Sequence, residues 1–444
     1  MVRLSSMQQP AMPPPRARPQ SQAVAAVALV ALLGSSCKAT CGPQRSQPAR
    51  SRQAPRAANR SCEDDSWVSY GHDARRTSAS PACCTGPLRE AWRFTPAPKG
   101  GRPAKPNHAI AAADAVFVAA VIGDAPALIR LTRDGEPVWV FDSRVDISQA
   151  HWPLLAHDHV VLNDVGLYIV DRSSGSRLFD RGLDSWGQVV ADASRLYMVN
   201  ERHVDGPLVR VGAFDSTGQL IWQQNVAGAV RDDVRDAVGA IALDEGTLYQ
   251  AADYRYTGLT GLFAFDATTG NARWTAIAHP AGGVSAGRGS LYLVERSRKG
   301  APALLTARTQ ASGDVRWSSP VRGHDGAAPA LVANLVLTFN PEASVDAWDA
   351  DSGQPVWTHS FPPSAGPQVP NSTHVAAALG SSTIVVTAGN TLAVLSAKDG
   401  RELWSEDLAN RGLGPVHSPI IANGRVYVVG DKEVVALDCA PDAL

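Results

Sequence analysis

The feature that most constrains this chain is a short motif that recurs along almost its whole length. In each copy an apolar strand leads into a polar residue, a short turn with a Gly, and an aromatic residue. The seven copies end at Trp139, Phe179, Trp222, Trp274, Trp317, Trp357 and Trp404, and the aromatic residue Trp92 lies on an earlier strand. They lie 40–52 residues apart, which is the length of one four-stranded blade of a β-propeller.

Each copy has the chemistry of a β-hairpin. In Ala264–Trp274, Asp266 can accept hydrogen bonds from backbone N–H groups of the turn, and Gly270 can supply a positive φ. The glycines expected to act in the same way are Gly135, Gly175, Gly218, Gly313, Gly353 and Gly400. The aromatic ring follows three or four residues later, so we expect it to pack against the neighbouring blade.

The ends of the chain indicate how the ring closes. Trp92 has no complete blade before it, and Glu433–Cys439 resembles the start of a motif whose Trp is missing. We therefore predict that the strand of Trp92 completes the last blade beside the strand of Asp438. The predicted fold is all-β: an eight-bladed β-propeller of four-stranded antiparallel blades, whose N- and C-terminal strands share the last blade.

The motif also carries a family resemblance. Ala264–Trp274 matches Ala-x-Asp-x-x-Thr-Gly-x-x-x-Trp at every position, and Ala347–Trp357 differs only in Ser352. This pattern resembles the tryptophan-docking motif of the PQQ-like (quinoprotein-type) propellers. The copy ending at Phe179 lacks the Trp, and the copy ending at Trp404 has Ser396 at the Asp position. The resemblance covers about 67–444 and implies an eight-bladed ring.

The first part of the chain predicts export. Residues 23–33 are eleven apolar residues, too few to span a bilayer but suited to a signal peptide. Small residues precede Cys37, which we predict to be lipidated; an ordinary cleaved signal is the alternative. The predicted domains are a signal peptide at 1–36, a disordered basic tether at 37–66 and the propeller at 67–444. The protein is then a lipoprotein of the outer membrane or cell surface, or else a soluble periplasmic or secreted protein.

The cysteines lie only near the two ends of the chain. The candidates for disulfides are Cys62, Cys83, Cys84 and Cys439. A bond from Cys439 to Cys84 or Cys83 would lock the ring covalently and contribute about 4–5 kcal/mol by the loop-entropy model. Cys62 could take the other adjacent cysteine, and a bridge between Cys83 and Cys84 is the rival pairing.

Charge and motifs narrow the function. The chain has 41 Lys and Arg against 42 Asp and Glu, so nothing favours a nucleic-acid partner. The sequence has no His-Glu-x-x-His motif, phosphate loop or Gly-x-Ser-x-Gly motif. We expect a monomeric propeller without catalytic residues, whose contact with the membrane is through the lipid anchor alone.

The resemblance raises the question of a cofactor. Quinoprotein dehydrogenases hold PQQ over a Ca²⁺ ion beside a disulfide between adjacent cysteines, but the pair Cys83–Cys84 precedes the first Trp strand. No acidic cluster has the spacing of a Ca²⁺ site. We expect no cofactor and no metal, with PQQ and calcium only if the protein is such a dehydrogenase.

Histidines at the start of several blades form one further candidate. These are His108, His151, His374 and His417, which belong to neighbouring blades around the ring. The first residues of inner strands face the axial funnel, so the four could form a metal or ligand site. The alternative is that they are solvated loop histidines.

The sequence favours a non-catalytic scaffold. The fold is similar to that of the lipoprotein BamB of the outer-membrane β-barrel assembly machinery, so we expect a protein partner in the cell envelope. This step is an analogy, because fold alone does not fix function. The alternatives are a PQQ-dependent alcohol or sugar dehydrogenase and a propeller that binds a carbohydrate or another ligand.

Overall fold

The computed structural model describes most of the chain from residue 66 to residue 440. The described ranges are 66–98, 104–123, 125–142, 152–163, 166–182, 188–202, 208–226, 229–230, 238–253, 259–296, 302–323, 326–340, 343–362, 373–378, 380–413 and 416–440. The predicted signal peptide, the predicted tether up to residue 65, and Cys37 and Cys62 lie outside these ranges.

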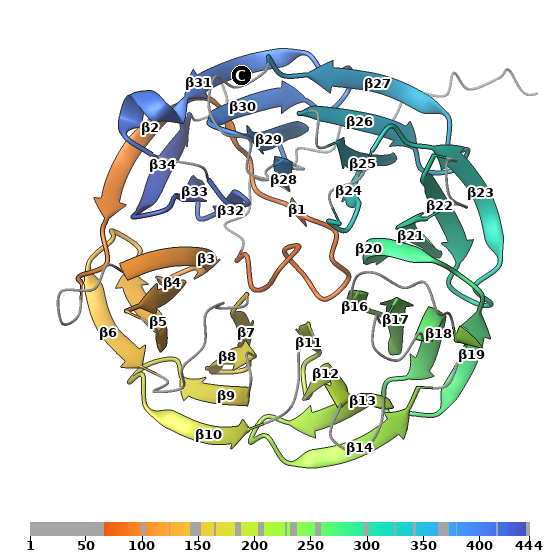
Figure 1. Cartoon of the computed structure of the whole chain (residues 1–444). Coiled ribbons are helices and arrows are strands. Elements are labelled where there is room, and N and C mark those ends of the chain that lie inside the picture. Colours follow the sequence, from red (N-terminus) through yellow and green to blue (C-terminus); the bar gives the residue numbers. More distant parts are fainter. Residues whose placement is uncertain are drawn as a thin grey trace, which may run out of the picture. The chain divides into compact units, whose positions relative to one another are not determined.

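The described residues form eight small sheets arranged around one axis (Figure 1). Within each blade four strands run antiparallel, from an inner strand at the axis to an outer strand at the rim. Blade 1 consists of β3 (Ala104–Ala112), β4 (Ala115–Ile122), β5 (Ala125–Thr132) and β6 (Pro137–Asp142), and blade 2 of β7 (Leu154–Ala156), β8 (His159–Asn163), β9 (Gly166–Asp171) and β10 (Arg177–Gly182). Blade 3 consists of β11 (Val189–Ala191), β12 (Arg195–Arg202), β13 (Leu208–Asp215) and β14 (Leu220–Asn225). Blade 4 consists of β16 (Val238–Asp244), β17 (Thr247–Asp253), β18 (Leu259–Asp266) and β19 (Ala272–Ala276), with β15 (Ala229–Val230) beside β18.

Blades 5 to 8 continue around the ring. Blade 5 consists of β20 (Pro280–Gly287), β21 (Ser290–Glu295), β22 (Leu304–Thr309) and β23 (Val315–Pro320), and blade 6 of β24 (Ala330–Val332), β25 (Leu335–Asn340), β26 (Ser344–Asp349) and β27 (Pro355–Ser360). Blade 7 consists of β28 (Thr373–Ala378), β29 (Thr383–Ala388), β30 (Thr391–Ser396) and β31 (Glu402–Asp407). Blade 8 consists of β32 (Ile420–Ala422), β33 (Arg425–Val429), β34 (Val434–Ala440) and β2 (Thr85–Phe94). A 3₁₀ turn, η1 (Leu408–Arg411), links blades 7 and 8. Among the residues that the structure describes, no helix has the length and apolar character needed to cross a membrane.

Blade 8 confirms the predicted closure of the ring. Its outer strand β2 comes from the start of the propeller, and its other three strands come from the end of the chain. Trp92 is paired with Ala436, and Arg89 is paired with Asp438. The eight-bladed fold predicted from the repeat is therefore confirmed, including the blade that the two ends share.

Tight aromatic contacts join each blade to the next. The seven turn glycines have φ between 69° and 87°. A Cβ added to Gly353 would lie 2.4 Å from Trp317 Cε3 of the preceding blade, a distance that no side chain tolerates. The Trp317 ring also donates from Nε1 to the carbonyl of Ala350, at 3.1 Å. Glycine is needed in this turn both for its φ and for the approach of the ring.

The junction between blades 7 and 8 uses a glycine that the repeat did not reveal. A Cβ on Gly86 would lie 2.4 Å from Trp404 Cβ. Gly86 belongs to β2, not to a hairpin turn, because the turn between the third and fourth strands is absent from a blade made of two chain segments. The apolar cores lie between neighbouring blades; the core of blades 3 and 4, for example, joins Tyr197 and Val211 to Ile241 and Phe263.

Phe179 offers a test of the aromatic junctions. Its ring contacts Gly218 as the tryptophans contact theirs, but it has no N–H to donate. We expect Phe179→Trp to add a hydrogen bond to the carbonyl of Ser216 and to raise the free energy of unfolding by about 1 kcal/mol. The matched reverse change is Trp222→Phe, which removes the hydrogen bond of 3.1 Å from Trp222 Nε1 to the carbonyl of Ala267. It should lower the free energy of unfolding by a similar amount. Equal urea midpoints for wild type and both variants would contradict this assignment.

The turn of Asp266 predicts a specific acid sensitivity. Arg273, and then the N–H and hydroxyl of Thr269, lower the pKa of this carboxyl from its usual 3.8 to about 2. Because the folded-state pKa is the lower one, the turn gains stability above about pH 4 and loses it as the pH falls to about 2. We expect Asp266→Asn to unfold at a lower temperature than wild type at pH 6 but at nearly the same temperature at pH 2. An NMR titration that places this pKa near 4 would refute the assignment.

Candidate functional site

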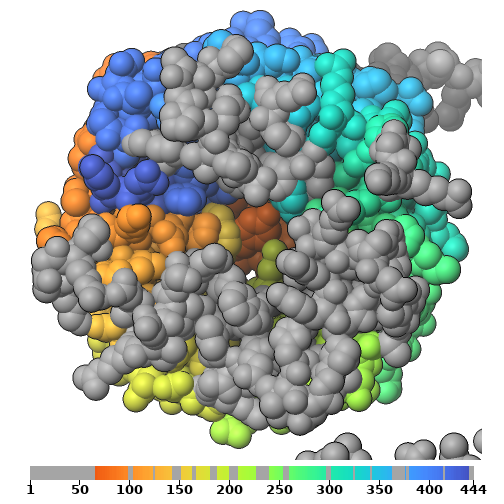
Figure 2. Space-filling view, in the orientation of Figure 1, coloured from red at the N-terminus to blue at the C-terminus, as the bar shows by residue number. Residues whose placement is uncertain are grey.

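The axis of the propeller is occupied by the chain's own segment Ser66–Cys84, hereafter the axial segment (Figure 1). It enters at blade 1, where the carbonyl of Trp67 accepts from Ala111 N at 3.0 Å. The next carbonyl, that of Val68, accepts from Leu155 N of blade 2 at 2.8 Å. Atoms from this part of the chain are visible at the middle of the face in Figure 2.

The backbone of the segment then contacts blades 4 to 7 in order. The carbonyl oxygens of Ala74, Arg75 and Thr77 accept from inner-strand amides of blades 4, 5 and 6, at 2.8–2.9 Å. Strand β1 (Ala79–Ser80) follows and pairs in parallel with β28 of blade 7. Inner strands of a propeller present an unpaired edge to the axis, and the axial segment supplies the acceptors that this edge needs.

Arg76 fixes the middle of the axial segment. Its side chain is 2 % exposed, and it donates from Nη2 to the carbonyl of Val189 at 2.8 Å and from Nε to the carbonyl of Ile241 at 3.2 Å. These bonds join blades 3 and 4 to the axis, and a third reaches the carbonyl of Tyr70. Burial lowers the pKa of Arg76 to about 10, so the guanidinium carries its positive charge at neutral pH.

The sequence placed these residues in the propeller but did not show that they fill its axis. Blade strands reveal themselves by apolar alternation and by the turn glycines. The axial segment has neither signal, since its contacts are made by backbone carbonyls and by one arginine. The only hint was that an aromatic and basic stretch with Trp67, Tyr70 and Arg76 precedes the first blade strand.

A pocket lies between the axial segment and three blade connections. Its aromatic walls are Trp67 and Tyr70 of the axial segment, Trp152 just before β7, and Phe339 of β25. The other lining residues are Gly71, Ser78, Ala327, Ala328 and Ser418. The pocket is partly open to solvent, and its water-sized space of about 20 Å³ has room for about one water molecule. None of the lining residues that the structure describes is acidic or basic.

Two of the four predicted histidines meet beside this pocket. His108 stacks on Trp152 with 4.0 Å between ring centroids, and the His417 ring is 5.5 Å from His108. Burial lowers the pKa of His417, which keeps its ring neutral at neutral pH. His151 and the side chain of His374 lie outside the described residues. Within the described part of the chain, no three His, Cys, Asp or Glu side chains are grouped as a metal site requires.

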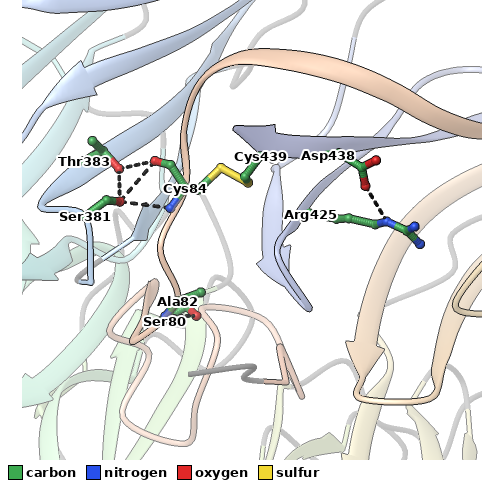
Figure 3. Close-up of a disulfide and its surroundings, with 8 residues drawn as sticks. All are labelled: Ser80, Ala82, Cys84, Ser381, Thr383, Arg425, Asp438 and Cys439. Carbon is green, nitrogen blue, oxygen red and sulfur yellow. Dashed lines mark hydrogen bonds and ion pairs between the residues drawn. A yellow bond between two sulfur atoms is a disulfide. The ribbon is translucent and has the colours of Figure 1, made fainter. Parts of the chain in front are cut away.

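The cysteines join the two ends of the propeller. Cys84, at the end of the axial segment, forms a disulfide with Cys439 after a sequence separation of 355 residues (Figure 3). The carbonyl of Cys84 accepts from Thr383 and Ser381 of blade 7. This pairing excludes the rival bridge between Cys83 and Cys84, because Cys84 has one sulfur. Cys83 is disulfide-bonded as well, and its predicted partner Cys62 lies outside the described residues.

The described residues do not fit a calcium-bound quinone. Ca²⁺ takes six to eight oxygen ligands, including carboxylates, and no such group exists among these residues. The axis instead carries the buried cation Arg76, which would repel a second one. The adjacent cysteines are not bonded to each other, as that site would require.

Comparison with known proteins agrees with the fold. The sequence profile of the family described as outer membrane protein assembly factor BamB matches residues 88–319 and 341–442. BamB from Moraxella catarrhalis is 14% identical over 79% of this chain and 100% of that one, with a TM-score of 0.55. Quinohemoprotein alcohol dehydrogenases from Comamonas testosteroni and Pseudomonas putida HK5 are each 14% identical, with TM-scores of 0.59 and 0.60. They cover 86% and 85% of this chain and 81% of their own chains. No protein of curated function matches the sequence.

These findings define the class of protein and then the family. The blades, their docked tryptophans and the shared last blade make this an eight-bladed propeller of the PQQ-like type. The chain belongs to the family described as outer membrane protein assembly factor BamB, whose profile covers most of its length. The solved structures share the fold, and they include both an assembly factor and dehydrogenases.

Proposed function

We propose that this protein is a non-catalytic, exported scaffold that binds a protein partner in the cell envelope. The observation that carries the proposal is the axial segment, which lies along the axis of the ring and buries the cation Arg76 between blades 3 and 4. Membership of a family described as an assembly factor supports the same function. Disulfides persist in oxidising compartments, which supports export, and we propose Cys37 as the lipid anchor.

The outer strand β14 is the best candidate for the partner's contact. Leu220 and Ile221 are 44% and 45% exposed, and the strand carries no Asp, Glu, Lys or Arg. Edge strands are ordinarily protected by charged residues or proline. The outer strand β23 has Arg316 and β27 begins with Pro355, whereas β14 has neither protection. An extended strand of the partner can pair with such an edge through backbone hydrogen bonds.

Purification from the native envelope in mild detergent tests the proposal. We expect proteins of the outer-membrane barrel-assembly machinery to accompany the wild-type chain and to be lost with Ile221→Arg. The matched control is Val315→Arg in β23, where Val315 is 52% exposed and the strand is already charged. Absence of these proteins from the wild-type preparation, or equal loss with both variants, would contradict the proposal.

The alternative function, that of a PQQ-dependent dehydrogenase, is tested in parallel. The purified protein is incubated with PQQ and Ca²⁺, and dye reduction is measured with alcohols and sugars. We expect no activity above that of free PQQ, because no carboxylate group among the described residues suits the ion. Dye reduction that depends on the protein and on Ca²⁺ would overturn the scaffold.

A further inference from the structure

Strand β2 closes the ring, but its backbone ladder with β34 is interrupted. The pairing shifts register twice, before Arg89 and after Glu90. The strand directly follows Cys84, so the disulfide to Cys439 holds this end of β2. The other end, residues 90–94, contains no cysteine. Non-covalent contacts must therefore hold this second end of β2 in blade 8.

Five charged side chains form a continuous network at this second end of β2. Arg93 donates to the two carboxylate oxygens of Glu90, at 3.2 and 3.0 Å, and to Glu433 Oε1 at 2.7 Å. Arg411 donates to Glu90 Oε2 at 3.1 Å and to the two oxygens of Glu406, at 2.8 and 2.7 Å. The charges alternate in sign along this closure network, in the order Glu406, Arg411, Glu90, Arg93 and Glu433.

The closure network joins three separate segments of the chain. Glu90 and Arg93 belong to β2, Glu406 and Arg411 to β31 and η1, and Glu433 directly precedes β34. The guanidinium of Arg93 also donates to the backbone carbonyl of Arg411, at 2.9 Å. A strand from the start of the propeller is thus joined by charge to residues that follow it by 318–340 positions.

The geometry of the network makes its charges count. A single exposed ion pair contributes little to stability, because water and salt screen it. Here two contacts are bidentate arginine–carboxylate pairs, and the five side chains are only 14–32% exposed. Linked charges with this geometry are the case in which surface pairs contribute measurably. Hydrogen bonds from Arg93 lower the pKa of Glu90 below its usual 4.5, so this carboxylate is ionised at neutral pH.

We propose that the closure network is a salt-sensitive latch on blade 8. When the ionic strength rises, the network weakens and residues 90–94 of β2 separate from β34 more often, while the disulfide keeps the Cys84 end in place. Blade 8 therefore opens locally and reversibly, and the ring stays joined. The opening leaves the edge of β34 unpaired, and an unpaired edge can bind an extended segment. This device does not depend on the proposed partner contact at β14.

Hydrogen exchange of the whole oxidised protein tests the latch. Exchange is compared at about 0.1 M and about 1 M NaCl, between which the Debye length falls from about 10 Å to about 3 Å. We expect the amides of residues 92–94 and 434–436 to exchange about fivefold faster at the higher concentration, as the weakening of a small ionic network should produce. Amides of β14 should keep their rates. Exchange that does not respond to salt, or equal acceleration in all blades, would overturn the proposal.

Variants separate the charges from the packing of β2. Arg411→Met removes the link from β2 to η1, so the same amides should exchange about fivefold faster already at the lower salt concentration and respond less to added salt. Arg411→Lys keeps the charge and should restore part of the protection and of the salt response. The matched control is Arg177→Met in β10, which breaks an isolated pair with Asp180 and should leave residues 92–94 and 434–436 unchanged. Wild-type protection in Arg411→Met would refute the latch.

A further arm tests the division of roles between the network and the disulfide. Cys84→Ser combined with Cys439→Ser removes the covalent hold on the first end of β2. In wild type the salt response should be confined to residues 90–94 of this strand and to their partners in β34. In the double variant it should extend along the whole of β2. A response that covers all of β2 in wild type, or that stays confined in the double variant, would contradict a latch at one end and a tether at the other.

Discussion

Replacement of Cys84 and Cys439 together by serine is expected to lower the free energy of unfolding by about 5 kcal/mol. The bond closes a loop of 355 residues, so its loss returns a large conformational entropy to the unfolded chain. The measurement is guanidinium unfolding of wild type and variant under oxidising conditions. We also expect faster unfolding, since non-covalent contacts alone would then join the two segments of blade 8.

A control separates the covalent bond from its surroundings. Thr383 Oγ1 donates to the carbonyl of Cys84 at 2.5 Å and also shares a hydrogen bond with Ser381 Oγ, so Thr383→Val removes these two local bonds and leaves the disulfide. We expect this variant to lose about 1 kcal/mol. If the double serine variant lost no more than Thr383→Val, the disulfide would not be the lock of the ring.

Arg76→Met is expected to lower the free energy of unfolding by about 3 kcal/mol. The variant leaves the buried carbonyls of Val189 and Ile241 without this donor, at about 1–3 kcal/mol for each buried unsatisfied group, whereas the carbonyl of Tyr70 keeps the Ser69 hydroxyl as a donor. Removal of the buried guanidinium returns part of this cost, because burial has lowered its pKa. The expected loss is therefore below the upper value of about 6 kcal/mol for the two carbonyls.

Hydrogen exchange locates this effect. The amides of Leu243, Ala286 and Leu331 donate to the axial segment, so they should exchange faster in Arg76→Met while amides of the outer strands keep their protection. The matched control is Arg75→Met, because Arg75 is half exposed and, among the described residues, its ion pair is with Asp73. That change should cost less than about 0.5 kcal/mol. Uniform loss of protection around all blades would contradict a local role.

The sequence predicted the parts of the fold that repeat. Gly270 and Trp274 stand at fixed spacings in the chain, so blade length, blade number and the place of the missing strand could all be derived. The disulfide followed only as a set of alternatives, since spacing cannot choose between Cys83 and Cys84. The structure chose Cys84 and so excluded the bridge between the two.

The candidate site could not be derived in the same way. The pocket joins Trp67, Trp152 and Phe339, which are far apart in sequence and belong to no repeated pattern. Of the predictions from the sequence, the histidine hypothesis came nearest to the location of the pocket. It named His108, whose ring stacks on Trp152, and His417, whose ring lies beside His108. It could not foresee that the axis beside them was already filled, because unpaired backbone edges leave no trace in side-chain composition.

The axial segment is collinear with the ring that surrounds it. Its backbone contacts run from Trp67 at blade 1 to Ser80 at blade 7, in the order in which the chain presents those blades. Because the axial segment precedes the blades in the chain, the backbone acceptors for the inner strands of blades 1, 2, 4, 5 and 6 are made before those strands. The blades can then form in their order along the chain, and the ring closes when β34 pairs with β2.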